Sequence, residues 1–216
     1  MNPLTKKANR ILTIIFLGFG IAYLMTLSYR PYPLCFMVKS IPIFCLSLFV
    51  LLNIPGKKGK LLFLGFLFSA FGDVFLSLQP KVFFEVGMGA FTIAHLFYIT
   101  VFLRKPLLNA KRGAALGIVI LYSAIYGVIL YPNLGSMMIP IYIYLGVISI
   151  MAISACLGRY NHPLIIAGAY LFIISDSIIA YSMFISRFDL SSLSVMITYY
   201  SAQLLIAYGC FLSREE

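Results

Sequence analysis

The stretch LLFLGFLFSAFGDVFLSL, residues 61–78, decides how the rest of the chain is interpreted. It contains a single charged side chain, Asp73, and no proline. An apolar run of about 20 residues is long enough to cross the hydrocarbon core of a bilayer as an α-helix. We therefore interpret residues 61–78 as a transmembrane helix that carries a carboxyl group into the membrane.

The whole chain has the composition of a membrane protein. Of its 216 residues, 62% are hydrophobic and only 10% are charged, and the mean hydropathy is +1.02. A soluble domain has about one quarter charged residues. The composition therefore excludes a soluble globule, a coiled coil and a disordered tail, and it predicts an all-α, polytopic membrane bundle.

Further apolar stretches of similar length lie on both sides of residues 61–78, and prolines and glycines interrupt the chain between most of them. Helices are expected because lipid cannot satisfy an open strand edge. The first stretch is followed by no small-residue cleavage site, so we expect it to be retained as a helix. Only short loops remain, and residues 1–216 are therefore expected to form a single transmembrane domain. The eight predicted spans are residues 11–28, 32–52, 61–78, 84–103, 113–131, 137–157, 164–184 and 191–212.

The basic residues indicate the orientation of these spans. Of the 16 Lys and Arg residues, twelve fall in one set of alternate loops and termini, three fall in the other loops, and Lys39 lies inside a span. Cytosolic loops carry such an excess, so both termini are predicted to be cytosolic. The net charge of +10 is spread over loops and forms no stripe, so nucleic acid is not an expected partner. The twelve are Lys6, Lys7, Arg10, Lys57, Lys58, Lys60, Arg104, Lys105, Lys111, Arg112, Arg159 and Arg214, and the three are Arg30, Lys81 and Arg187.

Four ionisable side chains lie clearly inside the predicted spans: Lys39, Asp73, His95 and Asp176. Such groups cost a few kcal/mol or more in a bilayer unless they are paired or hydrated, so they are functional candidates. With the predicted orientation, all four lie about 8 to 17 Å below the non-cytosolic boundary. This shared depth predicts one polar pocket within the bundle.

Three polar residues of the last span and one of the fourth belong to the same level. Tyr98 follows His95 by three residues and shares its helical face. Tyr199, Tyr200 and Gln203 fall at a comparable depth on residues 191–212. We expect these side chains to line the predicted pocket.

Two carboxyl groups in one pocket are suited to acid–base catalysis, because one can hold a proton while the other accepts one. Cleavage of acetal-like and enol-ether bonds uses such a pair and passes through an oxocarbenium-like species. The same groups could relay protons in a transporter or channel. A non-catalytic lipid-binding or scaffold protein, with Lys39 and one aspartate as a structural ion pair, is the remaining alternative.

The residues do not favour metal or nucleophilic catalysis. The chain has only two histidines, and His162 falls in a predicted cytosolic loop far from His95, so three histidines cannot gather around zinc. The four cysteines form no CxxC pair and are interpreted as small buried hydrophobes. No GxSxG motif is present. We expect neither a metal nor a cofactor.

A short internal repeat accompanies the two aspartates. Gly65 precedes Asp73 by eight residues, and Gly168 precedes Asp176 by the same number. The two spans are four apart and run in the same direction, as a parallel four-plus-four duplication would place them.

Several segments resemble the lysoplasmalogenase (YhhN-like) family of integral membrane proteins. They are GDVFL at residues 72–76, GMGAFTIAHLFY at 87–98, LFIISD at 171–176 and TYYSAQLLI at 198–206, and VKSIP at 38–42 resembles the lysine segment of the family's second helix. The order and spacing of these segments are more specific for the family than any single segment is. The resemblance extends over the second to the eighth predicted span and shows no departure at the charged positions.

The resemblance implies hydrolysis of the vinyl ether bond of lysoplasmalogens, which releases a fatty aldehyde and glycerophosphocholine or glycerophosphoethanolamine without metal or cofactor. A lysophospholipid is then the expected substrate, with membrane lipids and a second copy in a homodimer as expected partners. The expected location is the endoplasmic reticulum membrane. Asp73 and Asp176 are the expected catalytic residues, of which one donates a proton and the other orients or deprotonates water. Lys39 is expected either to stabilise the ionised carboxylate or to contact the lipid phosphate. The expected supporting residues are Lys39, His95, Tyr98, Tyr199, Tyr200 and Gln203.

Overall fold

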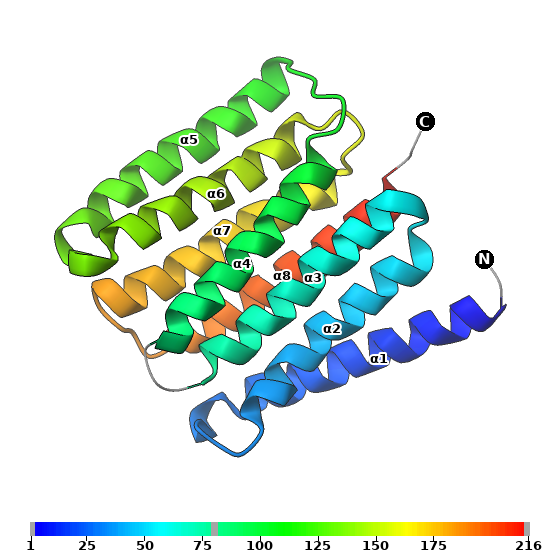
Figure 1. Ribbon diagram of the computed structural model, residues 1–216, viewed down its shortest axis with the longest axis horizontal. Helices are drawn as coiled ribbons and strands as arrows, with labels where there is room; N and C mark the ends of the chain where they lie inside the picture. The colour runs from blue at the N-terminus through cyan, green and yellow to red at the C-terminus, as the bar shows by residue number, and fades with distance from the viewer. Residues whose placement is uncertain (1–2, 79–81, 214–216) are drawn as a thin grey trace. The chain divides into compact units, whose positions relative to one another are not determined.

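The computed structural model describes residues 3–78 and 82–213, and its long helices match the predicted spans (Figure 1). In this part of the chain there are eight helices long and apolar enough to cross a membrane, and no strand longer than an isolated bridge. The predicted all-α, polytopic bundle is therefore confirmed. The helices are α1 (Pro3–Met25), α2 (Cys35–Asn53), α3 (Gly56–Leu76), α4 (Val82–Phe102), α5 (Ala110–Leu130), α6 (Met138–Leu157), α7 (Pro163–Phe184) and α8 (Ser191–Leu212), and the short 3-10 helices are η1 (Leu27–Tyr29), η2 (Tyr131–Asn133) and η3 (Gly135–Met137).

The chain divides into two compact units, Met1–Val101 and Phe102–Glu216, which we call unit 1 and unit 2. Unit 1 holds α1, α2, α3 and nearly all of α4, and unit 2 holds α5 to α8. The single transmembrane domain expected from the sequence stays a prediction.

In unit 1, α1 packs on α2 and α2 packs on α3, while aromatic rings join α3 to α4. Two glycines of α3 make this contact close. A Cβ atom at Gly65 would lie 2.6 Å from the ring of Tyr98, and one at Gly72 would lie 2.6 Å from the ring of Phe91. Small residues at helix contacts let membrane helices approach closely, and here they receive the rings of α4.

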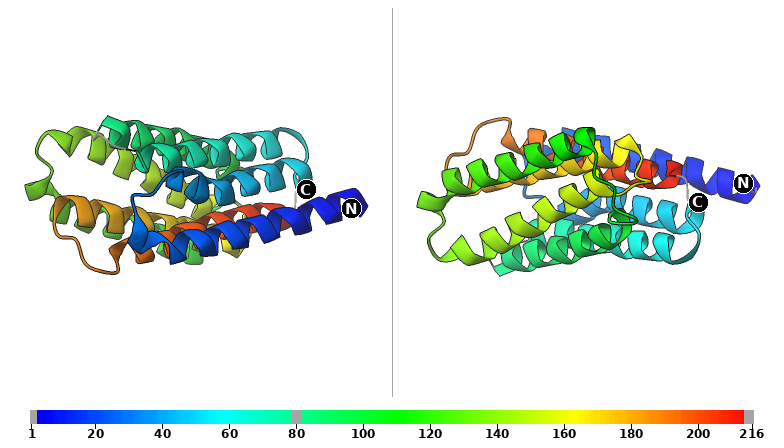
Figure 2. Two further views of the ribbon diagram at one scale, coloured as in Figure 1. Left: turned by 90° about the horizontal axis from the view of Figure 1, so that it is seen from below. Right: turned by 90° about the horizontal axis from the view of Figure 1, so that it is seen from above.

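In unit 2, α7 and α8 run side by side (Figure 2), and glycine again sets their distance. A Cβ atom at Gly168 of α7 would lie 2.8 Å from the carbonyl oxygen of Ala202 on α8. A Cβ atom at Gly209 of α8 would lie 2.7 Å from a side-chain carbon of Ile165 on α7. The two backbones therefore meet directly, and the glycine eight residues before each aspartate serves a different contact in each unit.

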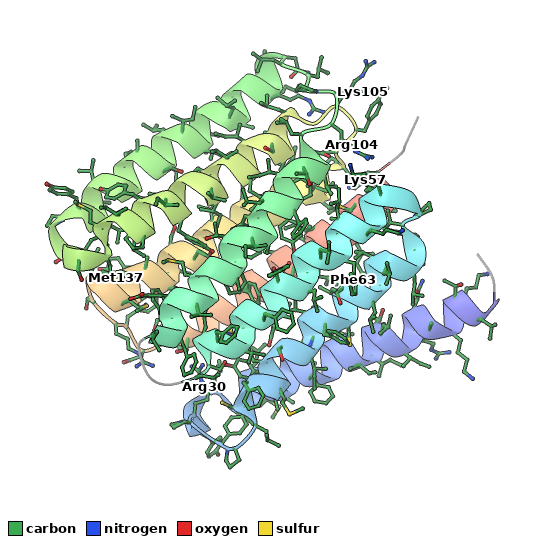
Figure 3. All side chains as sticks on the ribbon, viewed as in Figure 1. Arg30, Lys57, Phe63, Arg104, Lys105 and Met137 are labelled. Carbon is green, nitrogen blue, oxygen red and sulfur yellow. The ribbon has the colours of Figure 1, made fainter. Side chains whose placement is uncertain are left out.

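Basic residues gather at one end of unit 1. The side chains of Asn9 and Asn53 hydrogen-bond to each other at 2.8 Å, which joins the start of α1 to the end of α2. The N-terminal turns of α1 extend past the α2–α3 turn (Figure 2) and carry three cations, and the turn and the start of α3 carry three more. Arg30 lies at the opposite end of the unit from Lys57 (Figure 3). These six cations are Lys6, Lys7, Arg10, Lys57, Lys58 and Lys60.

Unit 2 shows the same separation of charge, and Arg112 fixes its basic end. The Arg112 guanidinium donates to the carbonyl oxygens of Cys156 at 2.6 Å and Gly158 at 2.7 Å, at the C-terminus of α6. The backbone N–H of Arg159 donates to the carbonyl oxygen of Lys105 at 3.3 Å. A cation at a helix C-terminus satisfies carbonyl groups that lack helical partners and complements the helix dipole.

Each unit thus keeps the alternate-loop charge pattern found in the sequence. The face of the membrane that each end occupies stays a prediction. Lys81, Arg214 and the predicted helix breaker at residues 79–80 lie outside the described residues.

Close packing at Gly168 gives a stability prediction. Gly168→Ala should lower the free energy of unfolding by about 1–3 kcal/mol, because the new methyl group meets the α8 backbone, which cannot move aside as a side chain can. Gly146→Ala in α6 is the control, since nothing lies within 4 Å of its Cβ position, and it should be neutral or stabilising by up to about 1 kcal/mol. Thermal unfolding in detergent measures the stability of both variants, and equal effects would contradict a direct contact between Gly168 and the α8 backbone.

Candidate functional site

A buried ion pair joins α2 to α3 in unit 1. The Nζ of Lys39 lies 3.1 Å from Oδ1 of Asp73, and the two side chains are 10% and 1% exposed. Lys39 is four residues from the start of α2 and Asp73 is three residues from the end of α3, so both lie about one turn from the same end of the unit. Their attraction offsets part of the cost of burying the two charges, and either charge alone would be left uncompensated.

Polar side chains of α3 and α4 continue inward from this pair. Ser69 lies one turn before Asp73 on the same helical face, and its hydroxyl is 3.4 Å from that of Tyr98. The ring of Tyr98 is 6.3 Å from that of His95, and both side chains are completely buried. Unit 1 therefore holds four of the predicted residues: Lys39 and Asp73 form an ion pair, and His95 and Tyr98 form a second buried contact further along α4.

In unit 2, Asp176 is bound by a tyrosine of a neighbouring helix. The hydroxyl of Tyr144 on α6 donates a hydrogen bond to Oδ2 of Asp176 on α7. Both residues are half-buried. A tyrosine hydroxyl is a neutral donor, so it holds one carboxyl oxygen in place without adding a charge.

The residues on either side of Asp176 are also bound to other helices. The Ser175 hydroxyl donates to the carbonyl oxygen of Val195 on α8 at 3.1 Å. The hydroxyl of Tyr126 on α5 donates to the carbonyl oxygen of Ser177 at 2.5 Å. Three consecutive residues of α7 are thus bound to three different helices, and the position of the Asp176 backbone is fixed from each side.

The polar residues of α8 form their own group in unit 2. Gln203 donates to the hydroxyl of Tyr199 at 3.2 Å, and the rings of Tyr199 and Tyr200 are 5.7 Å apart. Phe172 of α7 packs edge-on against Tyr199 with ring centres 5.5 Å apart. All three predicted α8 residues are buried, and their place in a pocket stays a prediction.

The structure therefore collects the predicted residues in two groups, one in each unit. Lys39, Asp73, His95 and Tyr98 belong to unit 1, and Asp176, Tyr199, Tyr200 and Gln203 belong to unit 2. That Asp73 and Asp176 serve one pocket stays a prediction.

Tyrosines are the participants that the sequence reasoning missed. Tyr144 and Tyr126 stabilise the Asp176 segment, and the fully buried Tyr23 accepts a hydrogen bond from Arg30 at 2.8 Å. A charge stands out in an apolar span, whereas the 15 tyrosines of the chain are too many to select among by residue type. A usable signal is that a tyrosine hydroxyl buried in a membrane helix usually finds a polar partner.

Taken together, the fold and these groups define an integral, multi-pass membrane protein with an acid on a helix of each unit. The YhhN family model matches residues 34–210. Lysoplasmalogenase TMEM86A of Bos taurus and that of Homo sapiens are each 34% identical to the chain over 193 residues, which cover 83% of the chain and 79% of each relative. The lysoplasmalogenase of Mycobacterium tuberculosis (strain CDC 1551 / Oshkosh) is 31% identical over 166 residues, which cover 74% of the chain and 64% of that protein. No solved structure matches.

The chain belongs to the YhhN family. The family model begins at the start of α2 and ends in α8, so it contains both aspartates and Lys39.

The buried pair makes a prediction about stability. Lys39→Met should lower the free energy of unfolding by about 3–5 kcal/mol, because it leaves the Asp73 carboxylate buried without its cation. The double variant Lys39→Met, Asp73→Leu should recover much of that loss, since no uncompensated charge remains. Lys60→Met, at an exposed position of α3, is the control. Denaturant unfolding in mixed micelles measures all three, and a double variant less stable than the single one would contradict the pairing.

Proposed function

We propose that this protein is a lysoplasmalogenase, a hydrolase that cleaves the vinyl ether bond of lysoplasmalogens. The observation that carries the proposal is the similarity to proteins of that name over most of the chain. The two acids support it independently, because carboxyl groups held within membrane helices, Asp73 buried and Asp176 half-buried, can supply the acid and the base that hydrolysis of an enol ether requires. The substrate is a single-chain lipid that already lies in the membrane, where the acids lie.

The reaction has three steps. A proton is added to the vinyl carbon beta to the ether oxygen, which leaves an oxocarbenium-like cation on the alpha carbon. Water attacks that carbon, loses a proton and gives a hemiacetal. As the bond from the hemiacetal carbon to the glycerol oxygen breaks, the hemiacetal hydroxyl loses its proton and the glycerol oxygen gains one, and the products are a fatty aldehyde and a glycerophospho-base.

The partners of the two acids suggest their roles. Asp73 is held as a carboxylate by the Lys39 ammonium at 3.1 Å, so it is suited to accept the proton of the attacking water. Asp176 receives the Tyr144 hydroxyl on Oδ2, which leaves Oδ1 to carry the proton that is given to the vinyl carbon. We assign Asp73 as the base and Asp176 as the acid.

The remaining predicted residues would position water and substrate. His95, Tyr200 and Gln203 are assigned to the water and the glycerol oxygens, and Tyr98 and Tyr199 orient His95 and Gln203 through the contacts described above. Residence in the endoplasmic reticulum membrane and assembly into a homodimer belong to the same proposal.

Removal of either carboxyl group tests the proposed chemistry. Asp73→Asn and Asp176→Asn should each lower kcat for aldehyde release by about 10²–10⁴, the usual contribution of one acid or base. Asp189→Asn, at an exposed loop position, is the control and should leave turnover unchanged. The assay uses purified, folded protein with a lysoplasmalogen, and a lysolipid with an ester in place of the vinyl ether should give no aldehyde. Normal turnover in either variant would remove that aspartate from the mechanism.

Tyr144 and Tyr142, two residues apart on α6, allow a test of whether Tyr144 positions the Asp176 carboxyl group or only packs. Tyr144→Phe removes the hydrogen bond to Asp176 and should lower kcat about tenfold, since a hydrogen bond to a carboxyl group is worth about 1.5 kcal/mol. Tyr142→Phe removes a bond of similar chemistry, from its hydroxyl to the Gly127 carbonyl at 2.8 Å, and should affect stability only. Steady-state kinetics and unfolding of both variants decide the matter, and equal losses of kcat would show that Tyr144 acts by packing alone.

A further inference from the structure

Arg30 is a cation outside the predicted pocket that the proposed mechanism does not use. It follows η1 and precedes α2, at the end of unit 1 where Lys39 and Asp73 lie (Figure 3). Its Nη1 donates to the hydroxyl of Tyr23 at 2.8 Å, and its guanidinium carbon is 5.6 Å from the centre of the Tyr23 ring. Its Nε lies 3.4 Å from the carbonyl oxygen of Leu27. The guanidinium is therefore held on a tyrosine and does not extend freely from the loop.

Tyr23, which holds this arginine, is buried in the same unit as the ion pair. Its side chain is completely buried, and its hydroxyl lies within electrostatic range of both Lys39 and Asp73. The loop is fixed as well, since the hydroxyls of Thr26 and Tyr32 lie 2.9 Å apart. Arg30 is thus held in place by a buried side chain of the unit that contains the proposed base, Asp73.

Arg30 also keeps the capacity to bind an anion. The side chain is exposed, and within the described part of the chain its Nη2 makes no hydrogen bond. A guanidinium presents a planar set of donors that matches the oxygens of a phosphate group. Lys39, by contrast, is engaged with Asp73, so it is poorly placed to serve as the main phosphate ligand.

We propose that Arg30 binds the phosphate of the lysophospholipid headgroup and so sets how deeply the substrate enters. This inference rests on the proposed function. In the substrate, the glycerol backbone alone separates the phosphate from the vinyl ether. In unit 1, about one helical turn separates the loop that carries Arg30 from the level of Lys39 and Asp73. A phosphate held at Arg30 places the vinyl ether beside the ion pair.

Two substrates that differ only in the phosphate test this role. One is a lysoplasmalogen, and the other is the matching 1-alkenylglycerol, which carries the same vinyl ether and no headgroup. Arg30→Gln should raise KM for the lysoplasmalogen about tenfold with kcat nearly unchanged, the effect of losing one charge-assisted hydrogen bond. The same variant should leave kcat/KM for the alkenylglycerol unchanged. Arg30→Lys should recover part of the loss, because a point charge replaces the planar fork.

Arg187→Gln is the matched control, since it removes an exposed loop arginine and should leave KM and kcat unchanged for both substrates. If Arg30→Gln lowers kcat/KM equally for both substrates, Arg30 acts on bilayer headgroups or on folding, and the inference is overturned. Unchanged KM for the lysoplasmalogen would overturn it too.

A binding measurement separates this inference from the proposed function. The affinities of wild type and Arg30→Gln are compared for an ester lysophosphatidylethanolamine and for the matching monoacylglycerol, neither of which needs to be cleaved. A tenfold weaker affinity for the first ligand alone supports the role of Arg30 even if wild type releases no aldehyde. Aldehyde release by wild type with equal affinities in the two proteins would leave the proposed function standing and reject the phosphate site.

Discussion

A charge inside a bilayer has to be neutralised close by, and this requirement organises unit 1. Lys39 and Asp73 each cost several kcal/mol alone, and at 3.1 Å their attraction offsets part of that cost. The pair fixes α2 against α3 at one level, because both side chains must reach the same point. Between α3 and α4, Phe91 packs against Gly72 next to this level, and Tyr98 packs against Gly65 about two helical turns further along α3.

The carboxyl group of Asp176 is accommodated in the membrane in a different way. Its carboxyl group accepts a hydrogen bond from the neutral hydroxyl of Tyr144, and the residues before and after it are bound to α8 and α5. A carboxyl group held by a neutral donor can keep or release a proton without breaking an ion pair, whereas protonation of Asp73 would break one. The difference between the two environments is what a pair of acids with opposite roles requires.

The sequence predicted the helices well because the membrane leaves few choices. A span of about 20 apolar residues has to be helical, and the eight predicted spans all appear as helices in the described residues. The main difference is at the N-terminus, where α1 begins at Pro3 and not at residue 11. Hydropathy detects only the part of a helix that lies in lipid, and Lys6, Lys7 and Arg10 continue the same helix beyond it.

The site was harder to predict, and the reason is chemical. Lys39 and Asp73 were found because a charge is rare and costly in a span, and depth counting then placed them at one level. Tyr144, Tyr126 and Tyr23 were missed because tyrosine is common in membrane helices and its ring packs as an apolar group. Only the fold shows which hydroxyl lies next to a carboxyl group. Pairing across helices depends on which faces meet, and residue spacing along one helix does not determine that.

Arg30 illustrates how one interaction changes the interpretation of another. While Lys39 was known only as a lysine in a span, it could serve either the acid or the phosphate of a lipid. Its position beside Asp73 commits it to the acid, and a substrate phosphate then needs a cation outside the pair. Arg30 lies at the same end of unit 1 and is held by Tyr23, so little side-chain entropy is left to lose when an anion binds. Because Lys39 is paired with Asp73, it is not available to bind the headgroup. Headgroup binding is then left to Arg30, a cation nearer the surface.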